Sequence, residues 1–251
     1  MALVAPDYDP FVILYGVPWD MYVKIDEALG EHHTRHTYSE GTLEMRGLLY
    51  GVSWEEYKRF LDALGDFNLR HTYCEGTLEM MSPRKDHDWT KTMIGRMIEY
   101  MALSFDIPIQ SVGSMTLTSD EVEKGLQPDE AYYVAHEWKV RGKDTYEPDV
   151  DPPPDLAIEV DVTNTCVPRL PTFARLHIPE IWRHDNDAVR FYRRVKSGRR
   201  RGKYQEIRKS VAFPFVEPAD INEVLAKKGV LDENALVRAF LRRVRRRRNK
   251  N

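Results

Sequence analysis

Three acidic residues interrupt an apolar segment of the chain, PPPDLAIEVDVTNT, at positions 152–165. Because side chains along a β-strand point alternately to opposite faces, the acids would share one face. The apolar face would carry Leu156, Ile158, Val160 and Val162. The other face would carry Asp155, Ala157, Glu159 and Asp161. Burying an unpaired carboxylate is costly, so the pattern predicts either a strand with one solvated face or the wall of an active site.

A further acid, Asp129, lies in the segment LQPDEAYYV at 126–134, at the start of another predicted strand. If the strands of Asp129 and Glu159 are neighbours, two carboxylates converge at one end of a sheet. Two close carboxylates do not both stay ionised without a cation. Mg²⁺ prefers oxygen ligands and typically takes one or two carboxylates plus water. This arrangement predicts metal-dependent phosphodiester chemistry, in which the ion neutralises phosphoryl charge and activates water.

The elements that must position these acids alternate between helices and strands. A helix is expected from Asp86 or Asp88 to about Phe105, since large apolar side chains recur there every four residues. Strands are expected at 107–112, 114–119, 131–136, 155–162 and 180–184, and helices at 168–177 and within 219–248. This order predicts an α/β fold in which a mixed sheet is flanked by helices.

The N-terminal part of the chain contains a repeat. Residues 15–45 recur at 50–80 with 18 of 31 positions identical, each copy predicting a helix followed by a strand pair that turns at Glu-Gly. Two copies are too few for a solenoid, so a duplicated α–β unit is expected. The expected division is an accessory unit at 1–48, a central domain at 49–215, and C-terminal helices with a basic tail at 216–251.

The composition, with 42% hydrophobic and 31% charged residues, is that of an ordinary globular protein. No apolar run reaches the roughly 18 residues of a membrane span, and the N-terminus lacks the basic region of a signal peptide. Two cysteines, Cys74 and Cys166, are too few for a disulfide framework or a zinc site. A cytoplasmic protein without membrane contact is therefore expected.

The net charge of −3 conceals a polarised chain. Residues 1–165 contain 31 acids and 14 Lys or Arg, whereas residues 166–251 contain 9 acids and 23 Lys or Arg. Two clusters, RRVKSGRRRGK at 193–203 and RRVRRRRNK at 242–250, are typical of contacts with polyanions, chiefly nucleic acid. Solvated faces or a solubility tail are the alternative. The candidate contacts are Arg199, Arg200, Arg201, Arg245, Arg246, Arg247 and Arg248.

Four blocks in order resemble the Uma-type putative restriction endonuclease family of the PD-(D/E)xK nuclease superfamily. They are YCEGTLEMMSP with the following His87, then QPDEAYYV, PPDLAIEVDVTNT and RLPTFARLHIPEIWR, which together span about residues 50 to 195. The resemblance implies a restriction-endonuclease-like core and makes Asp129 and Glu159 metal ligands, with the Val160 carbonyl as an extra ligand.

Other positions follow from the same resemblance. An acid of the family's first block matches Glu75 or Glu79, of which Glu79 is preferred because it lies nearer the following helix. His87 matches a histidine at the helix entrance that would orient a phosphate or a ligand, and a surface capping role is the alternative.

The chain departs from the motif at its lysine, because Asp161 stands two residues after Glu159. Family members often place a lysine on the following helix, and that position is Arg169 here. Arginine keeps the charge and clamps phosphate in two-bond geometry, but it does not readily exchange protons. Arg169 in the lysine's role and a weakened or lost activity are both open, and Asp161 is either another ligand or a solvated residue.

The leading hypothesis is a Mg²⁺- or Mn²⁺-dependent endonuclease that cuts DNA, with homodimer formation left open. Two alternatives come from other classes of protein. One is a catalytically silent nuclease fold that binds nucleic acid through its basic C-terminal third, and the other is a protein-interaction module built on the repeat.

Overall fold

The largest sheet of the molecule holds the two predicted carboxylate strands. The computed structural model describes residues 11–32, 36–67, 69–81, 85–143, 145–160, 169–185, 188–197 and 201–249. The sheet has six strands in the order β14 (Arg201–Ile207), β13 (Ala188–Ser197), β12 (Glu180–Asp185), β11 (Leu156–Val160), β10 (Glu130–Tyr133) and β7 (Gln110–Ser111). Strands β11 and β12 are parallel, while β10 is antiparallel to β11. The sheet is therefore mixed, as expected.

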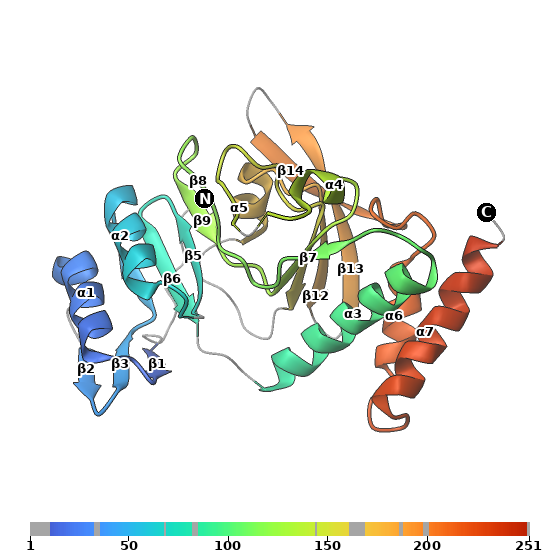
Figure 1. Cartoon of the computed structure of the whole chain (residues 1–251), viewed down its shortest axis with the longest axis horizontal. Coiled ribbons are helices and arrows are strands. Elements are labelled where there is room, and N and C mark those ends of the chain that lie inside the picture. The colour runs from blue at the N-terminus through green and yellow to red at the C-terminus, as the bar shows by residue number, and fades with distance from the viewer. Residues whose placement is uncertain are drawn as a thin grey trace.

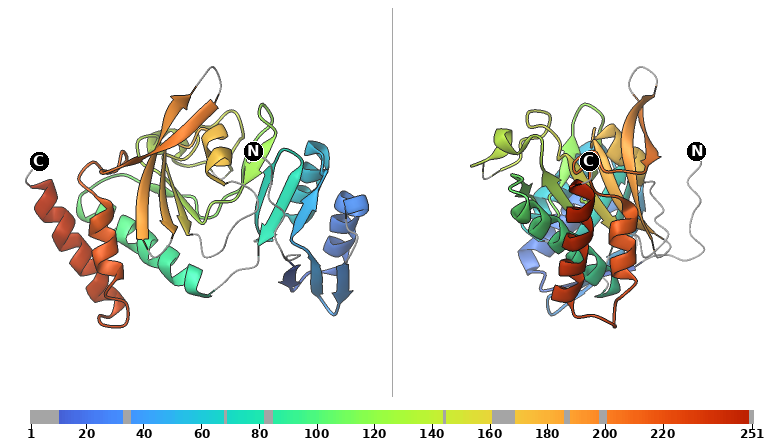
Figure 2. Two further views of the ribbon diagram at one scale, coloured as in Figure 1. Left: turned by 180° about the vertical axis from the view of Figure 1, so that it is seen from behind. Right: turned by 90° about the vertical axis from the view of Figure 1, so that its right-hand side faces the viewer.

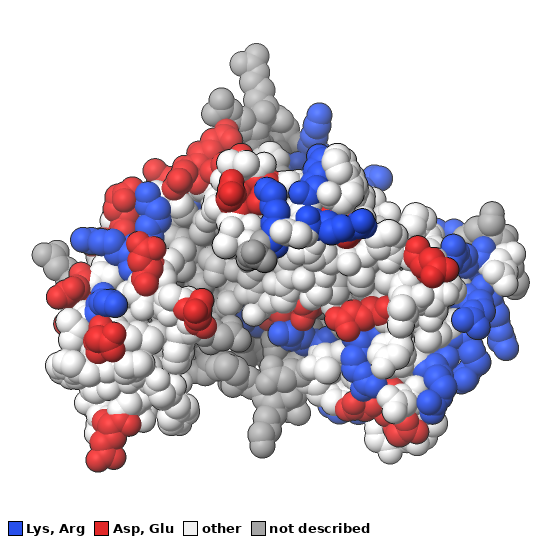
Figure 3. All heavy atoms as spheres, viewed as in Figure 1, with Lys and Arg blue, Asp and Glu red and all other residues white. Residues whose placement is uncertain are grey.

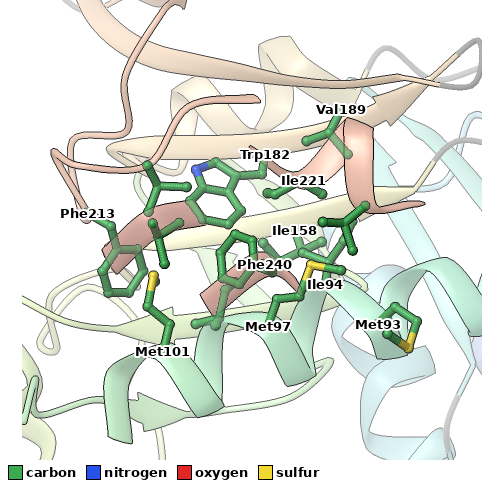
Figure 4. Close-up of a cluster of buried hydrophobic side chains, with 14 of the residues drawn as sticks. Met93, Ile94, Met97, Met101, Ile158, Trp182, Val189, Phe213, Ile221 and Phe240 are labelled. Atoms are coloured by element: carbon green, nitrogen blue, oxygen red, sulfur yellow. The ribbon is translucent and has the colours of Figure 1, made fainter. Parts of the chain in front are cut away.

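One face of this sheet is covered by three helices, α3 (Lys85–Ser104), α6 (Pro218–Leu225) and α7 (Glu233–Arg248). Figure 4 shows Met97 and Met101 of α3 packed among Phe240 of α7 and Trp182 of β12. Trp182 also stacks on Phe191 of β13, with ring centroids 4.3 Å apart. The apolar side chains that recur every four residues along α3 therefore lie in the hydrophobic core. Leu156, Ile158 and Val160 of β11 face this cluster.

The opposite face is covered by α5 (Arg169–Arg175) and by a second sheet. That sheet has five strands in the order β4 (Leu48–Tyr50), β6 (Thr77–Met81), β5 (Arg70–Cys74), β9 (Lys124–Leu126) and β8 (Leu117–Ser119). Ala157 of β11 packs there against Phe173 of α5 and Leu126 of β9. Every residue of β11 is buried, so the alternative of a strand with one solvated face is wrong. A short helix, α4 (Glu137–Val140), follows β10.

Each sequence copy, taken with the strand just before it, has the same order of strands and α-helices: strand, helix, strand, strand. The first contributes α1 (Trp19–Leu29), a 3₁₀ turn at Gly30–His32, and a three-stranded sheet in the order β1 (Phe11–Tyr15), β3 (Thr42–Arg46) and β2 (His36–Ser39). The second contributes α2 (Trp54–Leu64), β4, β5 and β6. Of these two helices, α2 begins with a capping box and α1 does not: the Ser53 hydroxyl accepts from the Glu56 backbone N–H, and the Glu56 carboxylate accepts from the Ser53 backbone N–H.

The copies differ in what lies beside their hairpins. In the second copy β5 pairs with β9, where Gly125 allows the Tyr57 ring to approach; an added Cβ would lie 2.2 Å from the Tyr57 hydroxyl. Helices α1 and α2 pack together, and both copies contribute to one hydrophobic cluster. Figure 1 shows the first copy at one end of the molecule, with α6 and α7 at the other.

The C-terminal helices share a core with the central part of the chain. Val216, Ile221 and Phe240 belong to the same cluster as α3 and β11, so residues on both sides of the expected boundary at 215 pack together. None of the helices within the described residues is long and apolar enough to cross a membrane.

Removing residues 1–48 tests how far the first copy is separable. The cut removes the first copy's share of the common cluster, including α1, which packs on α2, so apolar side chains of the second copy become exposed. We expect the truncated chain to keep its main sheet, to melt at a lower temperature and to self-associate, as measured by circular dichroism and light scattering. A monomer with an unchanged melting temperature would contradict this expectation.

Candidate active site

Asp129, the residue just before β10, lies opposite Glu159 of the adjacent strand β11. Glu130 pairs with Ile158 across β10 and β11, so Asp129, one residue earlier, falls opposite Glu159. Directly opposed residues share a face of the sheet, here the face covered by α5. The Asp129 Oδ2 atom also accepts from the Val160 N–H at 2.6 Å. Both carboxylates are buried, with Glu159 1% exposed.

Arg169 makes a two-bond ion pair with Glu159. Its Nε lies 2.5 Å from Glu159 Oε1 and its Nη2 lies 3.0 Å from Oε2, a geometry that adds both strength and orientation. Nη2 also donates to the Gln127 carbonyl at 2.7 Å, and Nη1 donates to the Thr72 hydroxyl. The guanidinium lies 5.6 Å from the centre of the Phe173 ring. Arg169 is therefore held by groups from both sheets and from its own helix.

A second arginine bridges the two carboxylates. Arg70, the first residue of β5, places Nη1 3.1 Å from Asp129 Oδ1 and contacts Glu159 Oε1 through Nη2. It lies 89 positions from Glu159 in the sequence, and the sequence analysis missed it. No local signal in the sequence could have found it: the spacing of two places Arg70 and Thr72 on one face of β5, but only the structure shows that this face meets the main sheet.

The four charged groups compensate one another. Burial raises the pKa of Glu159, while the guanidinium groups of Arg169 and Arg70 oppose that rise. A buried carboxylate that loses its partner typically costs about 3–5 kcal/mol. The arginines therefore explain how two acids are accommodated inside the protein.

Glu79 lies next to this cluster, whereas Glu75 does not. Glu79 pairs with Thr72 across β6 and β5 and is buried, so its side chain shares the face that carries Thr72 and Arg70. Glu75 lies in the hairpin turn with φ 50°, and its side chain is 85% exposed and contacts Lys124. Because Glu75 lies in the turn and not in a strand, the two acids do not share a face of the sheet, and Glu79 is the one beside the cluster.

Several predicted positions fall partly or wholly outside what the structure describes. Asp161 lies outside the described residues, and so does the side chain of His87, whose backbone is in the first turn of α3. Val160 ends β11, with its side chain in the core cluster. Within the described ranges, no group of three or more His, Cys, Asp or Glu side chains could hold a metal ion.

The basic residues lie on two separate elements. Arg199 and Arg200 are outside the described residues, and Arg201 begins β14, its side chain likewise not described. Figure 2 shows the hairpin of β13 and β14 projecting beyond the rest of the sheet. The other four arginines, Arg245 to Arg248, form the last turn of α7, so the expected tail is helical there.

The four C-terminal arginines have different surroundings. Arg247 lies 2.7 Å from Glu217, the residue before α6, and 3.2 Å from Asp220 on α6. Arg248 lies over the rings of Phe105 and Phe215. Arg245 and Arg246 are exposed.

His71 lies behind the site, on the other face of β5. Its Nδ1 is 2.8 Å from the Leu69 carbonyl, and its ring packs edge-on against Tyr57 and Phe60. Burial lowers the pKa of His71 to about 4, and the positive charge of Arg169 adds to this effect. The imidazole is therefore neutral at neutral pH, and it supports β5 from the core side.

A mixed sheet with helices on its faces and paired carboxylates on adjacent strands is the architecture of restriction-endonuclease-like proteins. The chain belongs to the Uma2 family, described as "Putative restriction endonuclease", whose model matches residues 54–225. The crystal structure of a putative nuclease belonging to DUF820 from Anabaena variabilis ATCC 29413 is similar at 15% identity and a TM-score of 0.40, covering 68% of this chain and 90% of that one. Among curated proteins, no sequence matches this chain.

The depressed pKa of His71 predicts a loss of stability in acid. Between pH 6.5 and about 4 the unfolded state binds a proton that the folded state excludes, so the free energy of unfolding falls as the pH falls. At about 1.4 kcal/mol per pH unit, the loss is on the order of 3 kcal/mol. Urea titrations across this range should show the loss in the wild type and a smaller one in His71→Leu. Equal losses in both proteins would contradict the assignment.

Proposed function

We propose that the protein is an endonuclease that uses Mg²⁺ or Mn²⁺ to hydrolyse phosphodiester bonds in DNA. One observation carries the proposal: Asp129, just before β10, and Glu159 of the adjacent strand β11 both contact the guanidinium of Arg70 where the two sheets meet. Membership of the Uma2 family supports the same activity.

The donor set suits a hard divalent ion. Asp129 and Glu159 offer carboxylate oxygens and the Val160 carbonyl would be a third oxygen, and Mg²⁺ commonly takes one or two carboxylates and completes its shell with water. In this proposal these three groups hold the ion. When bound, the ion would supply charge neutralisation at the phosphate and a lowered pKa for water.

The remaining groups have positioning and electrostatic roles. Arg169 orients Glu159 through its two-bond contact and brings positive charge close to the scissile phosphate. It does not serve as a base, because its guanidinium stays protonated. Glu79, on the neighbouring strand, adds a carboxylate next to the cluster. His87 and Asp161 are kept as candidates for ligand or phosphate contacts.

A second candidate function is supported by the same cluster. Arg70 and Arg169 already compensate both carboxylates, and Asp161 replaces the motif lysine. A catalytically silent nuclease fold that binds nucleic acid through its basic surfaces is therefore the alternative. In either case we expect a cytoplasmic location and DNA as the partner.

The basic surface of α7 supports the expected contact with DNA. Figure 3 shows Lys and Arg side chains along the edge of the molecule formed by α7. A groove of about 160 Å³ between α6 and α7 is lined by Lys227, Arg242 and Arg246 among others. Arg243 lies 2.6 Å from Glu223 and Arg247 lies 2.7 Å from Glu217. We therefore assign phosphate contacts to Arg242, Arg245 and Arg246 ahead of Arg243 and Arg247.

Plasmid nicking tests the activity and separates the two candidates. We expect wild-type protein to nick supercoiled DNA with Mg²⁺ or Mn²⁺ and not with EDTA. Asp129→Asn and Glu159→Gln should each reduce the rate by at least about 10²-fold, because each removes a charge from the ion site. Glu121→Gln, at an exposed carboxylate, serves as the control. Binding of DNA without metal-dependent nicking would favour the silent fold.

The dependence of DNA binding on salt tests the α7 assignment. Each phosphate contact contributes about −0.9 to the slope of log K against log salt. The double variant Arg242→Gln/Arg246→Gln should flatten the slope by roughly two units, for duplexes of any sequence. The matched double variant Arg243→Gln/Arg247→Gln should change it little, since these side chains pair with acids. Equal slopes for the two variants in fluorescence anisotropy would overturn the assignment.

A further inference from the structure

The guanidinium of Arg70 lies between the two carboxylates that the proposed function gives to the metal ion. It contacts Asp129 Oδ1 through Nη1 and Glu159 Oε1 through Nη2. We propose that Arg70 is an internal counter-ion that holds the metal position in the metal-free protein and is displaced when the ion binds, whereas Arg169 stays in place. This inference rests on the proposed function, since it concerns the same site.

The two carboxylates need a cation before any metal arrives. Both are buried and face each other on neighbouring strands, where two unpaired negative charges would repel and raise each other's pKa. Arg169 contacts Glu159, and Arg70 contacts both acids. A guanidinium is weakly hydrated and donates from several nitrogens in a plane, so it suits a position between two carboxylates in a partly buried site.

The surroundings of the two arginines show which of them can leave. The Arg169 side chain is 4% exposed and is held by the Glu159 carboxylate, the Thr72 hydroxyl and the Gln127 carbonyl. The Arg70 side chain is 19% exposed, the highest value among the four charged groups of the cluster. Arg70 is also the first residue of β5, where its backbone pairs with Met81 of β6 and not with β9, so its side chain can turn towards solvent while the strand pairing stays in place. Arg70 is therefore the displaceable partner.

The metal ion would thus compete with the Arg70 guanidinium for the two carboxylates. Binding of a divalent ion to Asp129 and Glu159 requires that the contacts of Arg70 with both acids be broken. While Arg70 contacts the acids, the site cannot take the metal, so only the fraction of molecules in which these contacts are open can bind it. The stronger the contacts, the smaller that fraction and the lower the apparent affinity for the metal. Removing the guanidinium should strengthen metal binding and weaken the metal-free fold.

Titration of the full-length chain with Mn²⁺, followed by electron paramagnetic resonance, measures this competition without reference to activity. We expect Arg70→Gln to bind Mn²⁺ at least about 10-fold more tightly than the wild type, which corresponds to about 1.4 kcal/mol. Arg70→Lys, which keeps one charge, should fall between them. Arg141→Gln removes a guanidinium that makes a two-bond pair with Glu137 on α4, and this matched control should bind as the wild type does.

Thermal denaturation provides the second measurement. Without metal, Arg70→Gln should melt below the wild type, and Mn²⁺ should raise its melting temperature by more than it raises that of the wild type. If Arg70→Gln does not fold, Arg70→Lys replaces it in both measurements, with the same direction of change.

The outcomes distinguish this inference from the proposed function. Mn²⁺ binding by the wild type, with equal or weaker binding by Arg70→Gln, would overturn the role of Arg70 and leave the nuclease proposal standing. Failure of all the variants and of the wild type to bind Mn²⁺ would overturn both. Tighter binding in Arg70→Gln without DNA cleavage would support the counter-ion role and overturn the proposed activity.

Discussion

The ion cluster of Asp129, Glu159, Arg70 and Arg169 is the interaction on which the rest of the structure depends. It is formed where the main sheet, the second sheet and α5 meet, and each contributes a charged group. Two ionised acids that face each other inside a protein repel and lose their hydration, so the folded state needs cations in contact with them. The cluster therefore couples the folding of the site to the docking of the two sheets.

The two faces of β11 divide structural and chemical roles between them. Leu156, Ile158 and Val160 are packed into the large cluster under α3, α6 and α7, which gives the strand a rigid support. Glu159 projects from the opposite face, next to Ala157, where α5 and β9 exclude most of the water. A carboxylate held this way keeps one orientation, and electrostatic interactions around it are stronger than at the surface.

The basic C-terminal region shows that a run of like charges is not a uniform surface. The fold of α6 against α7 places Asp220, Glu217 and Glu223 beside Arg243 and Arg247. These ion pairs stabilise the helix pair, while Arg242 and Arg246 are exposed and line the groove together with Arg243. An arginine that is already paired with an acid neutralises little phosphate charge, so it releases few counterions from DNA. Only part of the run is therefore expected to affect DNA binding.

The sequence by itself determined the features that depend on local periodicity. Alternation within 155–162 identified the carboxylate face of β11, and the four-residue spacing from Trp89 to Met101 identified α3. The QPD segment placed Asp129 at a strand entrance. The expected strand at 107–112 was too long, since β7 covers only Gln110–Ser111. Five strands were missed: β1, β4, β9, β13 and β14. The last two were missed because their basic residues conceal the apolar alternation.

Only the tertiary structure decided which residues complete the site. Arg70 and Thr72 come from a strand nearly 90 positions before Glu159, and the Gln127 contribution is a backbone carbonyl that any residue could offer. Their contacts follow from strand register and from the packing of one sheet on another, which depend on the whole chain at once. Local sequence patterns report which face a side chain occupies. They do not report which distant face it meets.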